Sequence, residues 1–409
     1  MAQDTGKRNF ISMLVEGGFY FTGYTFFDVY IVIPVFVYSM TNDLKLSGLA
    51  VAIKVSFFIL PQLIMGLYTS RIKNVPGFLG IVGLAGRLTF FMVPAFLLTG
   101  LSAYIKISVL IFALAAGSFS DGLTHVPWLD MMGRTIPPYR RGKLMGYQMI
   151  LGGIGGFGAG ILIKYILSGQ GTLETRYSLI FLVGAVIMSI AGALLFTLKD
   201  NERPVLKQNI NIRDFFGSLH VYFRKHPMYR KLILTQSIAG MSALASPLYI
   251  LFAKNHFALD QAQVSTLMLS QIAGSLFAGL IWGNMGQLKS NRFTIQAGIL
   301  TNIFTVALAV FLNYSDMEKP FLLLTVLVFA AGVLLGNYIG YLNYLMDIIS
   351  EKERPVYISL TYTILFPLTL VPLLGGFLAD TAGFMTVFFV VFVFCVTAYV
   401  TSFRLSSKT

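Results

Sequence analysis

The sequence predicts an all-α membrane protein whose twelve transmembrane helices form two six-helix halves. Its composition, the length of its apolar runs and an internal repeat lead to this prediction. Of the 409 residues, 56% are hydrophobic and only 11% are charged, and the mean hydropathy is +0.76. A soluble domain carries roughly a quarter charged residues. The chain therefore lacks the polar surface that a water-soluble fold needs.

Each apolar run is long enough to cross a bilayer as a helix. About 20 apolar residues in a helix span the hydrocarbon core, and a backbone exposed to lipid must satisfy its own hydrogen bonds. The strands of a membrane barrel would alternate in polarity, and these runs do not. The glycine, proline and charged residues between the runs delimit twelve predicted spans, at residues 10–39, 46–69, 77–99, 106–132, 144–168, 177–198, 232–253, 262–286, 293–313, 320–347, 356–379 and 384–403.

The basic residues predict the orientation of these spans. The chain carries 30 Lys and Arg against 17 Asp and Glu, a formal net charge of +13. Of the 30, 22 lie on one side and six on the other, in loops or near the ends of spans, while Lys54 and Arg87 lie deeper within spans. Because cytoplasmic loops are enriched in Lys and Arg, both termini are predicted to be cytoplasmic. The basic excess is thus a topology signal and gives no support to a nucleic-acid partner.

One long polar segment divides the chain into domains. We expect an N-terminal bundle at residues 1–198, a cytoplasmic connector at 199–231 and a C-terminal bundle at 232–409. Within the connector, apolar residues follow helical spacing and charged residues take the opposite face, which is typical of a helix lying on a membrane surface. The apolar stripe consists of Ile212, Phe215, Phe216, Leu219, Tyr222 and Phe223.

A constant offset of 213 residues relates the two halves. Apolar composition alone produces some matches at any offset, but proline, glycine and arginine have positional roles at the ends of helices. Two halves with the same orientation indicate a parallel duplication, which recurs among transporters. The matching pairs are Pro34 with Pro247, Gly66 with Gly279, and Arg141 with Arg354.

Two loops carry a resemblance to a known family. The loop after the second span reads GLYTSRIK from Gly66 to Lys73, and its repeat after the eighth span reads GLIWGNMG from Gly279 onward. The first loop is similar to the G-x-x-x-D-R-x-G-R-R loop of the major facilitator superfamily, with Ser70 in place of the family's Asp. The sequence therefore resembles this superfamily of transporters over nearly its whole length.

The resemblance implies both an architecture and a mode of action. It implies two bundles that expose a central cavity to each side of the membrane in turn, with spans 1, 4, 7 and 10 around that cavity. It also implies that cytoplasmic loops latch the halves together. The gate-loop residues carried over are Gly66, Arg71, Arg141 and Arg354.

Ionisable groups within the spans concentrate in the N-terminal half. A charged side chain costs about 2.5–3.5 kcal/mol at the centre of an inserted helix, so each such residue is a functional candidate. At a rise of 1.5 Å per residue, Asp28 and Lys54 lie about 15 and 12 Å deep, and Arg87 and Asp121 about 18 and 22 Å deep. Asp28–Lys54 and Arg87–Asp121 are therefore predicted intramembrane pairs. Such pairs either only hold helices together or include a carboxylate that exchanges a proton.

Polar and aromatic residues on the cavity-lining spans predict a solute site. A stripe with four-residue spacing runs along the first span from Glu16 to Asp28. On the fourth span, His125 follows Asp121 by one helical turn, which suits either a proton relay or a hydrogen-bonded structural histidine. We predict a substrate cavity lined by Tyr20, Tyr24, Asp28, Asp121, His125, Gln236, Asn337 and Tyr341.

The charge of the predicted cavity bears on the solute. Aromatic rings combined with an acidic surplus suit a neutral or cationic organic solute. An anionic solute would have only Lys54, Arg87 and His125 as counter-charges.

These features favour a secondary active transporter that moves a small organic solute by alternating access. We expect proton coupling through Asp121 or Asp28. A facilitative carrier without coupling is one alternative, and a membrane-embedded enzyme with an Asp/His site is another. The sequence contains no HExxH, GxSxG or P-loop motif, which disfavours an enzyme with catalytic residues of those kinds. It also lacks the filter-like loop or repeated charge rings of a channel.

The expected partners are few. Four scattered histidines and a single cysteine, Cys395, predict no metal site and no cofactor. We expect a monomer in the plasma membrane that crosses the bilayer many times and interacts with solute, protons and lipid.

Overall fold

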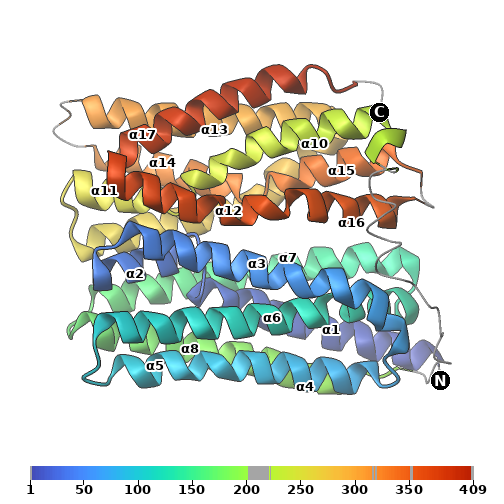
Figure 1. Cartoon of the computed structure of the whole chain (residues 1–409). Coiled ribbons are helices and arrows are strands. Elements are labelled where there is room, and N and C mark those ends of the chain that lie inside the picture. The colour runs from blue at the N-terminus through green and yellow to red at the C-terminus, as the bar shows by residue number, and fades with distance from the viewer. Residues whose placement is uncertain are drawn as a thin grey trace. The chain divides into compact units, whose positions relative to one another are not determined.

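The computed structural model describes residues 2–200, 221, 223–315, 317, 320–350 and 353–406. Within these residues every regular element is a helix (Figure 1). The chain divides into two compact units. Unit 1 comprises Met1–Thr41 and Ile53–Asn209, and unit 2 comprises Asn42–Ala52 and Ile210–Thr409. Of the predicted surface helix in the connector, residues 212–220 and 222 lie outside the described residues.

The helices of the first half follow the predicted spans 1 to 6. Short 3-10 turns extend or join several of them. The helices are α1 (Ala2–Phe26), α2 (Val32–Thr41), α3 (Leu44–Tyr68), α4 (Val75–Leu88), α5 (Met92–Leu97), α6 (Ala103–Thr135), α7 (Pro138–Ser168) and α8 (Leu173–Leu194).

The helices of the second half follow the predicted spans 7 to 12. Here too, 3-10 turns interrupt the seventh and eleventh spans. The helices are α10 (Pro227–Gly240), α11 (Tyr249–His256), α12 (Gln261–Leu288), α13 (Asn291–Tyr314), α14 (Phe321–Leu334), α15 (Tyr338–Ile348), α16 (Arg354–Leu365) and α17 (Val371–Ser402).

Two breaks reconcile these helices with twelve spans. Ten helical stretches in the described part of the chain are long and apolar enough to cross a membrane. The first span is not among them: it is divided into α1, which is long but less apolar, and α2, which is apolar but short. The last stretch contains two spans, because α17 continues through a kink at Gly383, where φ is 83° and ψ is 163°. The prediction of an all-α protein with twelve spans is confirmed.

Close backbone contacts at glycine hold neighbouring spans together. A Cβ added to Gly122 of α6 would lie 2.3 Å from the carbonyl oxygen of Phe58 in α3. In unit 2, a Cβ on Gly332 of α14 would lie 2.1 Å from the carbonyl oxygen of Gln271 in α12. Neither position tolerates a side chain without movement of a helix. In each half the fourth of its six spans thus packs on the second through a glycine.

The predicted repeat has a direct structural counterpart. Arg141 donates hydrogen bonds to the carbonyl oxygens of Gly133 and Ile136 at the end of α6. Arg354 donates to the carbonyl oxygens of Met346, at 2.9 Å, and Ile349, at 3.2 Å, at the end of α15. Donors and acceptors all differ by the same offset of 213 residues. The duplication therefore extends to individual hydrogen bonds that satisfy the last carbonyl groups of a helix.

Candidate functional site

The candidate site is a buried ionic cluster in unit 1, centred on Arg87. The guanidinium Nη2 of Arg87 donates a hydrogen bond to Glu16 Oε1 at 3.1 Å, and its Nε lies 3.7 Å from Asp121 Oδ1. The side chains of Arg87, Glu16 and Asp121 are only 5%, 8% and 12% exposed. One guanidinium is thus shared by two carboxylates away from water, and removal of one partner from such a group is costly.

Close packing between helices brings these groups together. A Cβ added to Gly86 of α4 would lie 2.2 Å from Cβ of Ser120 in α6, and the Ser120 hydroxyl donates to the carbonyl oxygen of Val82 at 2.5 Å. Arg87 follows Gly86 and Asp121 follows Ser120, so this contact between α4 and α6 brings the two charged side chains close to each other. The sequence predicted this pair from its depth alone.

Tyr20 joins the cluster from α1. Its hydroxyl donates a hydrogen bond to Asp121 Oδ2 at 3.1 Å, and the centroid of its ring lies 5.0 Å from the guanidinium carbon of Arg87. Since Glu16 precedes Tyr20 by four residues, both side chains lie on the same face of α1. Glu16 was part of the predicted stripe but not of the predicted site. Its four-residue spacing to Tyr20 was the signal that could have placed it there.

The second predicted pair is arranged differently. Lys54 Nζ lies 3.1 Å from the ring centroid of Tyr24, a cation–π contact, and within the described residues it is buried without a hydrogen-bond partner. Asp28 is not within ion-pairing distance of Lys54 in that part of the chain. Instead, Asp28 Oδ1 accepts the backbone N–H of Tyr30 at 2.8 Å, and its carbonyl accepts the N–H groups of Val32 and Ile33. Asp28 therefore lies in the break between α1 and α2, where it satisfies backbone N–H groups of the connecting turn and of the start of α2.

His125 is turned away from the predicted relay. Its ring meets Phe58 edge-on at a centroid distance of 5.5 Å, and no hydrogen bond to Asp121 occurs among the described residues. The spacing of four residues along α6 placed both on one face, but the imidazole packs against α3 rather than against the carboxylate.

The predicted site residues of unit 2 lie in neutral surroundings. Gln236 and Asn337 are half-buried. Tyr341 is 6% exposed, and its hydroxyl has no hydrogen-bond partner in the described part of the protein. Every buried charged side chain among the described residues belongs to unit 1, namely Glu16, Lys54, Arg87 and Lys106.

The gate-loop residues are placed as follows. Arg71 is exposed, with its guanidinium 5.0 Å from the centre of the Tyr68 ring. The surroundings of Gly66 lie outside what the structure describes. Arg141 and Arg354 donate hydrogen bonds to carbonyl oxygens at the ends of α6 and α15, respectively. Among the described residues no group of three His, Cys, Asp or Glu side chains could hold a metal ion.

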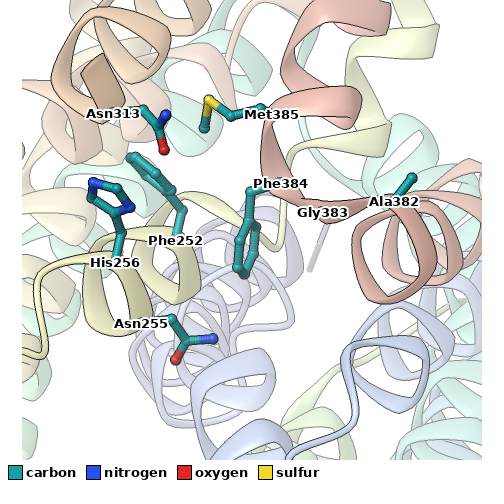
Figure 2. A pocket seen from close by; sticks show the side chains of 8 residues that line it. All are labelled: Phe252, Asn255, His256, Asn313, Ala382, Gly383, Phe384 and Met385. Carbon is teal, nitrogen blue, oxygen red and sulfur yellow. The ribbon is translucent and has the colours of Figure 1, made fainter.

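A separate small cavity lies in unit 2 (Figure 2). It has a volume of about 270 Å³ and contains no carboxylate, lysine or arginine. Figure 2 shows it at the kink of α17, with the end of α11 opposite. Its lining consists of Phe252, Asn255, His256, Asn313, Ala382, Gly383, Phe384 and Met385. It does not include any residue of the ionic cluster.

Comparison with known proteins decides the family. A model of the Major Facilitator Superfamily matches residues 19–250 and 232–408. The chain belongs to the Major Facilitator Superfamily. The resemblance inferred from the sequence is confirmed, and membership in the superfamily indicates a multi-pass membrane transporter rather than an enzyme. No curated protein sequence matches the chain.

Solved structures of the superfamily share its fold. The nucleoside transporter NupG aligns with a TM-score of 0.68 and 14% identity, over 97% of this chain and 98% of that one. A D-xylose–proton symporter gives 0.70 and 12%, covering 98% of both chains. A bacterial homologue of the iron transporter ferroportin, in an inward-facing state, gives 0.68 and 13%, covering 98% and 99%. At such identities the likeness concerns the fold alone.

Proposed function

We propose that this superfamily member is a proton-coupled secondary transporter of a small organic solute, and that the Arg87 cluster is its proton site. The observation that carries the proposal is the sharing of one buried guanidinium by Glu16 and Asp121. A purely structural pair needs one carboxylate for one base. A second carboxylate on the same base is the arrangement in which one of the two can be protonated at low cost.

The charge balance of unit 1 supports a single exchangeable proton. Apart from Lys106, which lies 3.7 Å from Glu174, three carboxylates, Glu16, Asp28 and Asp121, stand against the two bases Lys54 and Arg87 in the interior of the unit. One negative charge is therefore in excess inside a membrane-spanning bundle, where an uncompensated charge is expensive. One proton restores neutrality. We assign it to Asp121, because its 3.7 Å contact with Arg87 is longer than the 3.1 Å hydrogen bond of Glu16.

The solute would meet this proton site through the aromatic stripe of α1. Tyr20 bonds Asp121 directly, and Tyr24 covers Lys54. We propose that these two, with Asp28, Gln236, Asn337 and Tyr341, line the path of the solute. Superfamily members of similar fold include a nucleoside transporter and a D-xylose–proton symporter, which supports a polar organic solute and proton coupling as working hypotheses.

The proposed setting is the plasma membrane, with both termini cytoplasmic and the protein acting as a monomer. The support for this orientation is the distribution of basic residues, 22 on one side against six on the other.

Replacement of one carboxylate tests the proposal. Asp121→Asn keeps the shape of the side chain but cannot exchange a proton. We expect solute flux driven by a pH gradient in proteoliposomes to fall by about tenfold or more, while exchange of solute without a gradient persists. A panel of sugars, nucleosides and amines serves to find the solute, with a dye inside the vesicles reporting proton movement. Asp130→Asn, on the same helix but paired with Arg134 near its end, is the matched control and should transport normally.

An uncoupled carrier is the alternative outcome. In that case solute enters without proton movement, and Asp121→Asn behaves like Asp130→Asn. Either result would remove Asp121 from the mechanism.

A further inference from the structure

A groove at one end of unit 1 has the chemistry of a lipid site. It lies between the end of α5, the end of α7 and the beginning of α8, and its volume is about 570 Å³. One part of its lining is apolar and includes Leu98, Ile166, Leu179 and Leu182. The other part is polar and consists of Ser168, Gly169, Gln170, Thr175, Arg176 and Ser178.

The apolar part lies on the surface of the unit. Leu98 is 65% exposed, Leu179 48% and Leu182 41%, and Tyr165 beside them is 78% exposed. In a multi-pass membrane protein, exposed leucines on helices that cross the bilayer face acyl chains. A tyrosine near a helix end is typical of the boundary between hydrocarbon and headgroups. The groove therefore opens toward lipid at the level of the headgroups.

Arg176 supplies a cation at the polar end. Its Nη1 donates to the carbonyl oxygen of Leu167 at 2.6 Å, which holds the guanidinium over the end of α7. Its Nε is buried without a hydrogen-bond partner, and no carboxylate pairs with it within the described residues. The nearby carboxylate of Glu174 lies 3.7 Å from Lys106 instead. No carboxylate of the described residues therefore neutralises Arg176, and a guanidinium, with five N–H donors in a planar fork, suits the recognition of a phosphate.

The cavity of Figure 2 lacks these features. It is bordered by aromatic rings and amides and has no basic Lys or Arg side chain in its lining. Of these two cavities in the described part of the protein, the groove of unit 1 is the one that combines an apolar channel with a cation at the membrane boundary, and charge complementarity selects its occupant.

We propose that this groove binds an anionic phospholipid. The phosphate lies against Arg176, and one acyl chain follows Leu98, Leu179 and Leu182 along α8. An anionic headgroup is preferred over a zwitterionic one because the polar end presents a positive charge with no carboxylate of its own to attract choline or ethanolamine.

Lipid binding to the purified full-length protein tests the proposal. Phosphatidylglycerol and phosphatidylcholine with identical acyl chains are titrated in detergent, and bound lipid is counted by native mass spectrometry. We expect the wild type to prefer phosphatidylglycerol and Arg176→Gln to bind it at least about tenfold more weakly. Arg134→Gln, which removes an ion-paired arginine from the same unit, should leave the preference intact. Equal binding of phosphatidylglycerol by the wild type and Arg176→Gln would overturn the proposal.

A second variant guards against misfolding of the first and separates lipid from free anion. Leu182→Gln leaves Arg176 and its bond to α7 unchanged. It should weaken phosphatidylglycerol binding while leaving thermal stabilisation by inorganic phosphate as in the wild type. If Leu182→Gln binds phosphatidylglycerol as tightly as the wild type, the groove does not hold an acyl chain, and Arg176 is at most a site for a free anion.

Discussion

The two halves of the molecule share a helical frame but differ in what they bury. In unit 1 the interior contains Glu16, Arg87 and Lys54, with Asp121 beside them. In unit 2 the buried polar groups described are neutral. Trp282, for example, donates its indole N–H to the carbonyl oxygen of Val333 at 2.8 Å, and Asn302 and Gln271 are 5% and 1% exposed.

This difference separates the parts of the repeat that serve packing from those that serve chemistry. The glycine contacts and the arginines at helix ends occur in both units, because any six-helix half must satisfy its backbone groups and pack its spans. The charges occur in one. The position that matches Arg87 at the offset of 213 is Leu300, which is 45% exposed. Under the proposed function, these charges of unit 1 serve proton exchange.

We expect the largest loss of stability when the charged interior of unit 1 is disrupted. Arg87→Met would leave Glu16 and Asp121 buried without their shared cation, and breaking a buried ionic group in this way costs about 3–5 kcal/mol. We expect a large fall in the thermal unfolding temperature of the purified protein. Adding Glu16→Gln and Asp121→Asn to the same variant should restore most of that loss, because no buried charge then remains unpaired at this site.

The control for this experiment is Arg134→Met. Arg134 forms ion pairs with Asp130 and Asp200 at the end of α6, where its side chain is 28% exposed. Exposed pairs contribute about 0–1 kcal/mol, so this variant should unfold near the wild-type temperature. If Arg87→Met were as stable as Arg134→Met, the buried cluster would not hold unit 1 together.

The sequence was sufficient to predict the spans, the duplication and the pairing of Arg87 with Asp121. The spans follow from the length of the apolar runs, the duplication from a constant offset, and the pair from depth along a straight helix. All three can be read from the positions of residues in the sequence. Glu16 as the closer partner of Arg87 depends on how α1 is rotated about its axis. That rotation is set by packing against α7, where a Cβ added to Gly17 would lie 2.2 Å from the side chain of Gln148. The spacing of residues along the sequence does not predict such a contact.

For Asp28 and His125, too, the sequence did not predict which groups the side chains contact. Asp28 was expected to pair with Lys54, but the first span breaks there, and the carboxylate accepts the N–H of Tyr30. Amino-acid pattern alone did not separate a capping aspartate from a buried ionic one. His125 lies on the predicted face of α6, and only the neighbouring helix determines that its ring meets Phe58.

We expect an intermediate loss of stability when the close contacts at glycine are disrupted. This experiment tests whether the same kind of contact packs the spans within each unit. Gly122→Ala and Gly332→Ala each place a methyl group against a backbone carbonyl, at 2.3 and 2.1 Å. Overpacking of this kind typically costs about 1–3 kcal/mol, and a backbone atom cannot rotate away. Both variants should therefore lower the unfolding temperature by similar amounts. Gly158→Ala on α7, where an added Cβ meets nothing within 4 Å, should be neutral or slightly stabilising. A loss confined to one unit would show that the close approach of spans is not a shared device.

The smallest expected effect concerns the arginines at the helix ends. Arg141→Gln and Arg354→Gln each remove hydrogen bonds to the last carbonyl groups of the preceding helix. Hydrogen bonds from a charged donor contribute about 1.5–3 kcal/mol, but both side chains are half-exposed, so we expect a loss of about 1 kcal/mol in each case. Lys143→Gln, an exposed site two residues beyond Arg141, is the control. Equal losses would mean that the frame is symmetric even where the interior is not. A loss in Arg354→Gln alone would instead place the repeated hydrogen bonds among the features in which the two halves have diverged.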